Sequence, residues 1–529
     1  ATLIQKVEVL ELNLDETANE ENDYYLNLWQ YPYSSAEYYD VEAFSKEHLA
    51  IVKNQMQPYM DAGGKTGTAS IVDEPWYHQT YCDYPSMVKW IKNNGEWQFD
   101  YTDFDVWVDF LINEVKVSYV ECYSIVPWGN IIRYIEEGVE KEQDAAPGSA
   151  AWEEAWRPFL ESFTKHLDEK GWYDKIIIAM DERPMDQMDT ALNLIESIKN
   201  KEGHTFKVGG AVGSYNKDVW DRLFTVTPHI GNINNWNISI DTIRRVAKER
   251  REEGKLTSIY TMISDYPGMF SMSDPGEAAW TIWFAEYCHT DGFLRWAYDA
   301  WVENPLEDNA HAYFEAGDMF FVYPGEYAGE DTQVRTTPRF EMLSEAIKDV
   351  KKLRQISAMN EAAKEKVDAL IDSVKSFYGQ SYNNGIGTAG FKTPTDATRN
   401  ALGNEVERLH NETIKLSYEF ERATIKEANY SDVEKALIAA VAINRDDYTL
   451  ESIEILDQAI ANVEYGYSAV YQDKVNAMAQ RIIDAIANLE LKVFDINKQA
   501  LSIAIEMAES VTQEQLDKVV PAVANEFIA

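Results

Sequence analysis

Short apolar runs alternate with amphipathic segments through residues 1 to roughly 350, and this alternation constrains the fold more than any other feature of the chain. Eight runs rich in apolar, β-branched and aromatic residues are typical of strands. They are residues 6–12, 67–72, 117–124, 175–180, 206–212, 229–236, 257–263 and 292–298. Four segments between them repeat apolar residues at helical spacing, namely 102–115, 151–171, 188–200 and 240–254.

Strands that alternate with helices favour a parallel sheet covered by helices. Eight such units predict a (β/α)8 barrel of the TIM type. A doubly wound open sheet shows the same alternation and is the alternative. No glycine-rich phosphate-binding loop follows any predicted strand, which disfavours the open sheet. Because 529 residues exceed what one hydrophobic core supports, we expect two or three domains.

The character of the sequence changes after about residue 350. Residues 339–378 show a helical pattern, whereas 379–400 are rich in Gly, Thr and Asn and predict a loop or linker. Amphipathic helical segments fill the rest, as a helical hairpin and an incomplete second copy of it. The predicted domains are the barrel over 1–350, a helix and linker over 351–400, and an all-α region over 401–529, which we interpret as a spacer.

Composition excludes several classes of partner and cofactor. The formal net charge of −42 argues against a nucleic-acid partner, because phosphate repels such a surface. The three cysteines are far apart and show no CxxC spacing, so neither a zinc site nor a disulfide framework is indicated. We find no HxH, HExxH or GxSxG motif, and we predict neither a metal nor another cofactor. No apolar run is long enough to span a membrane, and no signal peptide is visible at Ala1.

The stretch "YDKIIIAMDERPMDQM" runs from a buried strand directly into two adjacent acids, Asp181 and Glu182. Loops that follow the strands form the active face of a TIM barrel. Successive residues leaving a strand point in different directions, so the two carboxylates could approach one substrate from different angles. An ordinary turn with a helix cap and a local ion pair is the alternative, and the second acidic pair, Asp73 and Glu74, shows that the dipeptide alone is weak.

Aromatic, amide and acidic residues recur where other predicted strands end. Aromatic faces pack on the C–H surfaces of sugars, and amides and carboxylates bind their hydroxyls. Each ring taken singly is better explained by packing, but their recurrence at the same end of different strands favours a sugar site. The candidate substrate-binding residues are Trp76, His78, Gln79, Tyr123, Asn235, Trp236, Tyr260, Asp265, Trp296, Tyr298 and Trp301.

Four motifs together resemble glycoside hydrolase family 123, a family of exo-acting β-N-acetylgalactosaminidases. They are "DEPWYHQTYCDYPSMVKWIKNNGEWQFDYTDFDVWVD", "IIIAMDERP", "DGFLRWAYDAWVENP" and "GDMFFVYPG". The likeness extends from about residue 24 to 350 in the same order along the chain. It implies a (β/α)8 catalytic barrel with an adjacent Asp-Glu pair after one strand.

The resemblance also implies a substrate-assisted retaining mechanism. The 2-acetamido oxygen of the sugar attacks its own anomeric carbon and forms an oxazoline, so this mechanism departs from the usual pair of separated carboxylates. Carried over, Asp181 polarises the acetamido group and Glu182 is the general acid and base. The acid must hold a proton near neutral pH while the polariser stays ionised, and adjacent like charges push the two titrations apart.

The same resemblance places Trp296, Tyr298 and Trp301 in the wall of the sugar pocket and gives Tyr260 or Tyr123 a hydrogen bond to the acetamido oxygen. The expected substrate is a glycan with a terminal β-linked N-acetylhexosamine. A β-N-acetylglucosaminidase and a glycan-binding barrel without activity are alternatives. A conventional glycosidase is another, pairing Glu182 with a distant acid among Asp265, Asp299 and Glu121.

Two departures from the family pattern bear on organisation. Members usually carry an N-terminal β-sandwich, whereas here the barrel begins almost at once, which predicts either a trimmed chain or a divergent branch. The helical region resembles FIVAR-type repeats, found in secreted, surface-attached bacterial carbohydrate enzymes. This likeness implies an extracellular or cell-surface location. The sequence ends within a repeat, at "ANEFIA", so we expect a longer natural chain. The oligomeric state, the linkage and the choice between galacto and gluco sugars stay open.

Overall fold

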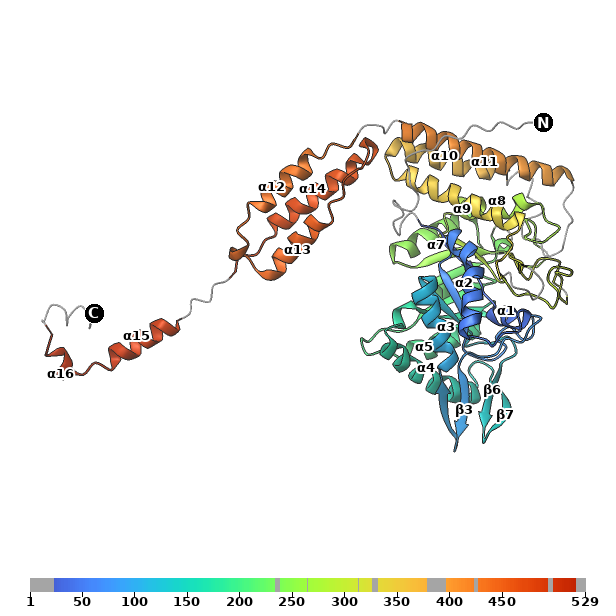
Figure 1. Cartoon of the computed structure of the whole chain (residues 1–529), viewed down its shortest axis with the longest axis horizontal. Coiled ribbons are helices and arrows are strands. Elements are labelled where there is room, and N and C mark those ends of the chain that lie inside the picture. Colours follow the sequence, from blue (N-terminus) through green and yellow to red (C-terminus); the bar gives the residue numbers. More distant parts are fainter. Residues whose placement is uncertain are drawn as a thin grey trace. The chain divides into compact units, whose positions relative to one another are not determined.

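The computed structural model divides the chain into two compact units, residues 1–421 and 422–529, which are described separately (Figure 1). The structure describes residues 23–233, 238–263, 265–312, 314–325, 332–377, 396–422, 427–492 and 498–519.

The first unit is built on eight parallel strands in the order β1-β12-β11-β10-β9-β8-β5-β2. They are β1 (Tyr25–Leu28), β2 (Thr66–Ser70), β5 (Tyr119–Tyr123), β8 (Ile176–Asp181), β9 (Lys207–Val212), β10 (Thr225–Pro228), β11 (Leu256–Tyr260) and β12 (Gly292–Arg295). This nearly closed sheet, with its helices, confirms the predicted (β/α)8 barrel. Because all eight strands are parallel, their carboxyl ends meet at one face.

The barrel closes between β1 and β2 through backbone and side-chain contacts. Leu26 forms a parallel bridge with Gly64, and the N–H of Lys65 donates to the carbonyl of Leu26 at 3.0 Å. Just beyond, the backbone N–H of Gln30 donates to Thr68 Oγ1 at 3.1 Å, and the N–H of Thr68 donates to Gln30 Oε1 at 2.9 Å. These contacts continue the sheet where the ladder of regular strand bonds ends.

Helices follow the strands, including the four that apolar periodicity predicted at 102–115, 151–171, 188–200 and 240–254. They are α1 (Pro32–Tyr38), α2 (Lys46–Asp61), α3 (Thr102–Asp109) with a π-helical continuation (Phe110–Val115), α4 (Ala150–Lys170), α5 (Met185–Glu196), α6 (Lys217–Trp220), α7 (Ile240–Glu252), α8 (Pro275–Tyr287), α9 (Pro338–Ser357), α10 (Glu361–Phe377) and α11 (Asp396–Arg422). Helix α4 begins where the Ser149 side chain accepts the N–H of Trp152. It ends at Gly171, whose φ of 71° is left-handed and favours a residue without a Cβ. Helices α8 to α11 form a layer at one end of the unit (Figure 1).

A second sheet, in the order β4-β3-β6-β7, lies in the long loops that follow β2 and β5. Its strands are β3 (Lys89–Asn93), β4 (Glu96–Asp100), β6 (Ile131–Glu136) and β7 (Val139–Asp144). Trp90 anchors the sheet on α4, with its ring stacked 4.8 Å from that of Phe159. The sequence analysis did not anticipate this sheet, because its strands are half exposed and highly charged.

The strand predicted at 229–236 is not found over residues 229–233, and residues 234–236 lie outside the described residues. The strand β10 ends at Pro228, and Ile230–Asn232 form a 3-10 turn. The true strand was hidden because two of its four residues, Thr225 and Thr227, are polar yet buried. Thr227 is satisfied by a hydroxyl–hydroxyl bond of 2.7 Å to Ser258 on β11. The predicted strand at 6–12 lies outside the described residues, and β1 is the first strand of the barrel.

In the described residues of the second unit, all regular secondary structure is helical. Its helices are α12 (Ser431–Val441), α13 (Leu450–Ala461), α14 (Gln472–Ala487), α15 (Gln499–Glu509) and α16 (Gln513–Leu516). Helix α12 joins the predicted hairpin of α13 and α14, and the three share a core around Val433, Leu456, Val475 and Ile482. Among the described helices of either unit, none has the length and apolarity needed to cross a bilayer.

Barrel closure predicts that Gly292→Ala will destabilise the first unit. A Cβ at this position would lie 1.8 Å from the carbonyl oxygen of Tyr25 on β1, so the two strands must separate. We expect a loss of about 1–3 kcal/mol in the free energy of unfolding, measured by calorimetry. The matched control is Gly403→Ala, where a Cβ meets nothing within 4 Å and the helix α11 should gain about 0.5–1 kcal/mol. Equal stability of the two variants would contradict the tight β1–β12 pairing.

Candidate functional site

The adjacent acids Asp181 and Glu182 lie at the carboxyl end of β8, which pairs with β5 on one side and β9 on the other. Residues Ile176–Met180 are buried, whereas Asp181 and Glu182 are half-buried at the barrel face. Asp181 still pairs with Ala211 of β9, and the N–H of Glu182 donates to the carbonyl of Ala211 at 3.0 Å. Glu182 has a left-handed backbone with φ of 47°, which is strained for a residue with a Cβ. The chain therefore turns sharply between the two acids.

Each acid accepts a hydrogen bond from a different aromatic residue. Trp128, in the loop after β5, donates its indole N–H to Asp181 Oδ2 at 2.9 Å. Tyr260, the last residue of β11, donates its hydroxyl to Glu182 Oε1. The two donors come from different strands, so the carboxylates are held separately rather than bonded to each other. This arrangement suits two acids with different tasks at one substrate.

The electrostatic setting raises the pKa of Asp181 to about 8. Burial is the largest cause and the charge of Glu182 is the second, while the Trp128 bond and the Arg183 cation act in the opposite direction. Arg183 lies over the Trp128 ring, 5.1 Å from its centroid. This setting favours the protonated form of Asp181 at neutral pH, whereas the sequence analysis expected this residue to be ionised.

Two of the predicted aromatic residues belong to a cluster of rings beside the acids. The ring of Tyr123 lies 4.5 Å from that of Trp29 and 5.2 Å from that of Trp76. Tyr31 is 5.2 Å from Trp76 on another side. The cluster is buried and joins the ends of β1, β2 and β5. It gives the barrel face an aromatic floor next to β8.

The Tyr123 hydroxyl is directed into the barrel. It donates to Glu121 Oε2 at 2.8 Å, and Asn27 Nδ2 donates to the same oxygen at 2.9 Å. Tyr25 donates its hydroxyl to Glu121 Oε1 at 3.3 Å. Burial raises the pKa of Glu121 despite these bonds. Glu121 thus stabilises the interior of the barrel, and the Tyr123 hydroxyl is committed to it.

A carboxylate–imidazole pair lies at the ends of β10 and β11. His229 Nε2 is 2.8 Å from Asp265 Oδ2, which also accepts the backbone N–H of Met262 at 2.7 Å. The His229 ring lies 5.0 Å from that of Tyr260. The structure therefore brings Asp265 next to the residue that holds Glu182. The predicted residues Asn235 and Trp236 lie outside the described residues.

The loop after β2 places its two polar candidates nearer to solvent. His78 is 54% exposed, and its backbone N–H donates to Glu74 Oε2 at 3.0 Å. Gln79 is half-buried. Among the described residues, Glu74, His78 and Asp83 form the group whose spacing would suit a metal ion. The second oxygen of Glu74 accepts the N–H of Tyr84 at 2.6 Å, so its carboxylate already stabilises the loop.

The three candidate aromatic residues after β12, namely Trp296, Tyr298 and Trp301, differ in their surroundings. Trp296 is half-buried, and its ring contacts those of Phe314 at 4.8 Å and Tyr31 at 6.1 Å. Tyr298 is buried and donates its hydroxyl to the carbonyl of Gln55 in α2 at 2.7 Å. Trp301 is buried and donates its indole N–H to the carbonyl of Val322 at 2.8 Å. Trp296 is thus the member with ring surface left for a ligand.

Asp299 is fully buried between these residues. Its Oδ1 accepts the backbone N–H of Tyr31 at 2.7 Å, and its Oδ2 accepts Gln55 Nε2 at 2.6 Å. Burial raises the pKa of Asp299 to about 7. Both oxygens are committed to the contact between the β1 loop and α2, so this acid has a structural task.

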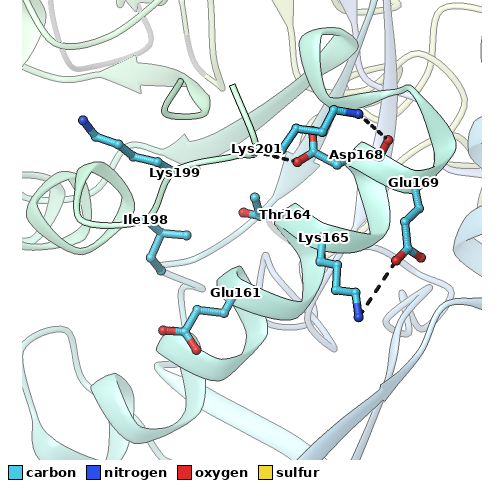
Figure 2. A pocket seen from close by; sticks show the side chains of 8 residues that line it. All are labelled: Glu161, Thr164, Lys165, Asp168, Glu169, Ile198, Lys199 and Lys201. Atoms are coloured by element: carbon cyan, nitrogen blue, oxygen red, sulfur yellow. Dashed lines mark hydrogen bonds and ion pairs between the residues drawn. The ribbon is translucent and has the colours of Figure 1, made fainter. Parts of the chain in front are cut away.

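A hollow on the outside of the barrel contains no candidate residue. Figure 2 shows its lining from α4 and the segment after α5, with Thr164 at its floor. Its charges pair locally, since Lys165 Nζ lies 3.9 Å from Glu169, and the Lys201 N–H donates to Asp168 Oδ2 at 2.9 Å. The acids at the end of β8 therefore form the better candidate for catalysis.

Sequence reasoning missed two residues of the site, His229 and Tyr31, and it noted Trp128 at a strand end without assigning it a partner. Trp128 follows a recognised strand, but only the fold brings its N–H to Asp181. His229 fell within a segment taken for a strand, and Tyr31 follows β1, which was not recognised. Had the short run "YLNL" been read as a strand, Tyr31 would have stood at a strand end like the other aromatic candidates.

Comparisons with known proteins identify the family of the chain. The chain matches the family described as glycoside hydrolase 123, catalytic domain, over residues 29–356. A solved family 123 glycoside hydrolase from Clostridium perfringens, described as acting on glycolipid glycans, is 36% identical, with a TM-score of 0.70 over 76% of this chain and 70% of that chain. An endo-β1,6-glucanase is 10% identical with a TM-score of 0.38, over 61% of this chain and 76% of its own. No curated protein matches the chain significantly. The chain belongs to glycoside hydrolase family 123 and is a glycan-hydrolysing enzyme.

Proposed function

We propose that the protein is a retaining exo-β-N-acetylgalactosaminidase that works through an oxazoline intermediate. The observation that carries the proposal is the adjacent pair Asp181 and Glu182, held apart by Trp128 and Tyr260. A sugar that supplies its own acetamido nucleophile needs one group to orient the amide and one to protonate the leaving oxygen. Two acids that leave one strand in different directions can do both.

The raised pKa of Asp181 indicates which of the two acids carries the catalytic proton before the sugar binds. Before a sugar binds, burial and the Glu182 charge favour the protonated form of Asp181. The acetamido N–H of a bound sugar stabilises the anionic form of Asp181, and so does the positive charge that develops on the oxazoline ring. We propose that substrate binding therefore moves this proton to Glu182, which delivers it to the leaving oxygen. Water then attacks the anomeric carbon, Glu182 takes a proton from it, and the acetamido group is restored.

The structure disfavours the conventional two-carboxylate alternative. Its second acid would be Asp299, Glu121 or Asp265. Both oxygens of Asp299 and both of Glu121 accept bonds from protein donors. Asp265 Oδ2 is bound to His229 and to a backbone N–H. A glycan-binding barrel without activity would have no use for the strained turn that separates Asp181 from Glu182.

We infer the substrate from the relative and from the aromatic face. The Clostridium perfringens enzyme is described as hydrolysing glycolipid glycans. We propose that this chain removes a terminal β-linked N-acetylgalactosamine from glycans of this kind, outside or on the surface of a bacterial cell. A screen of aryl β-glycosides that differ only at C2 and C4 tests both the sugar and the need for the acetamido group. Cleavage of a sugar without the acetamido group would contradict the mechanism.

The division of roles predicts a dependence on the leaving group. Glu182→Gln should lower kcat/KM by about 10²–10⁴-fold on a glycoside with a poor leaving group, because no proton is delivered. On an activated aryl glycoside the loss should be much smaller. Asp181→Asn should lower both rates, since it removes the charge that supports the oxazoline. Steady-state kinetics on the two substrates measures the difference.

A thiazoline analogue of the oxazoline provides the control for this experiment. It should inhibit the unchanged enzyme and should bind weakly to Asp181→Asn. An enzyme that cleaves the glycoside and ignores the analogue does not use the acetamido group. Equal losses on both leaving groups in Glu182→Gln would exclude Glu182 as the proton donor.

The pKa of Asp181 predicts the alkaline limb of the pH profile. The pair holds its proton below about pH 8 and loses it above. On a poor leaving group, kcat/KM should therefore fall as the pH rises through about 8. On an activated aryl glycoside, which needs only the anionic Asp181, this fall should be absent.

Substitution of Trp128 should shift the alkaline limb of the pH profile. Trp128→Phe removes the N–H that stabilises ionised Asp181, so the pKa rises and the limb should shift by about one pH unit to higher pH. Trp90→Phe is the matched control, because it removes an indole N–H that donates to the carbonyl of Ile71. If the alkaline limb shifts equally in both variants, or does not shift in Trp128→Phe, Trp128 does not control the pKa of Asp181.

A further inference from the structure

Tyr31 carries a polar group that the fold leaves unsatisfied. The residue is 1% exposed, and its hydroxyl has no hydrogen-bond partner among the described residues. Its backbone is firmly held, since its N–H donates to Asp299 Oδ1 at 2.7 Å and α1 begins at the next residue. The backbone at Tyr31 is therefore fixed, whereas its buried hydroxyl makes no hydrogen bond within the described part of the chain.

Tyr31 lies at the barrel face that carries the acids. It follows β1, and its ring lies 5.2 Å from Trp76, 5.2 Å from Tyr84 and 6.1 Å from Trp296. Burial comes first among the causes that raise its pKa well above the usual range, and the charge of Asp181 contributes. The phenol is thus neutral at any working pH and within electrostatic reach of Asp181. Trp76, beside it, has a buried indole N–H that is equally unpartnered among the described residues.

Burying a hydroxyl without a partner destabilises a folded protein, because the group loses its bonds to water. A phenylalanine would fill the same space among the aromatic rings without that cost. The hydroxyl is useful if a ligand completes its bonding. In a sugar site that ligand is a ring hydroxyl, which can both donate and accept.

We propose that Tyr31 is a specificity-determining residue that hydrogen-bonds one hydroxyl of the terminal pyranose through its free phenol group. The inference rests on the proposed function and extends it to a residue outside the candidate set. The phenol would discriminate against sugars that lack or misplace that hydroxyl, because its own hydroxyl would then stay buried and unsatisfied. Trp76 Nε1 would supply a second donor on the same side of the sugar.

The test combines Tyr31→Phe with aryl β-N-acetylgalactosaminides that lack the 3-, 4- or 6-hydroxyl. Against the complete sugar, Tyr31→Phe should lower kcat/KM roughly 10- to 100-fold. One of the three deoxy sugars should be cleaved equally by both proteins, because the bond is already absent from that substrate. The other two should show the full loss. The deoxy sugar that escapes identifies the hydroxyl bound by Tyr31.

Tyr24→Phe is the matched control. Tyr24 precedes β1 as Tyr31 follows it, and its hydroxyl is also buried and unpartnered among the described residues. Its ring lies against Arg354, 5.3 Å from the guanidinium, at the amino end of the strand. Tyr24→Phe should leave kcat/KM unchanged on all four substrates. The melting temperature of Tyr31→Phe should equal or exceed that of the unchanged enzyme, which separates a loss of binding from a loss of folding.

The outcomes distinguish this inference from the proposed function. If the unchanged enzyme cleaves the complete sugar and Tyr31→Phe loses the same factor on all three deoxy sugars, Tyr31 binds none of these hydroxyls and the inference is overturned alone. An undiminished rate in Tyr31→Phe overturns it as well. If the unchanged enzyme cleaves no N-acetylhexosaminide, the proposed function fails, and the inference fails with it.

Discussion

Closure of the parallel barrel between β1 and β2 is the constraint on which the rest of this structure depends. The bridge from Leu26 to Gly64 and the reciprocal bonds between Gln30 and Thr68 bring the first strand next to the second. On the other side, β1 approaches β12 so closely that Gly292 has no room for a side chain. With the sheet closed, residues that follow β1, β5, β8 and β11 meet at one face. The carboxylates, their aromatic donors and the ring cluster are consequences of that meeting.

Asp181 and Glu182 gain their properties from strands other than their own. Trp128 and Tyr260 reach Asp181 and Glu182 from β5 and β11. The positive φ of Glu182 turns the chain between two neighbouring side chains and so allows different partners for each. Burial and mutual repulsion then leave a proton on the pair near neutral pH. A buried, strained and partly protonated pair is costly for folding, and such a cost is common at catalytic sites.

Particular residues show why the sequence predicted some features and not others. The apolar run Ile176–Ile178 is buried on both sides of the sheet, and its pattern located β8 and the acids that follow it. The buried threonines of β10 carry no such signal, because their polarity is satisfied only across the sheet. Tyr298 and Trp301 stand at a strand end as expected, yet their polar atoms bind carbonyls within the barrel wall. A strand-end position does not reveal whether a side chain points to a ligand or to its neighbours.

The sequence by itself determined the alternation of strands and helices, the barrel and the place of the two adjacent acids, because local periodicity and strand-end position are properties of contiguous residues. It also carried the motifs of the family. It did not reveal β1, β10 or the second sheet. Only the tertiary structure decided which donor meets which carboxylate, which aromatic rings are buried and which hydroxyl lacks a partner. Those properties depend on contacts between residues about 50 to 80 positions apart, such as Trp128 with Asp181 and Tyr260 with Glu182, and on the exclusion of water by the closed sheet.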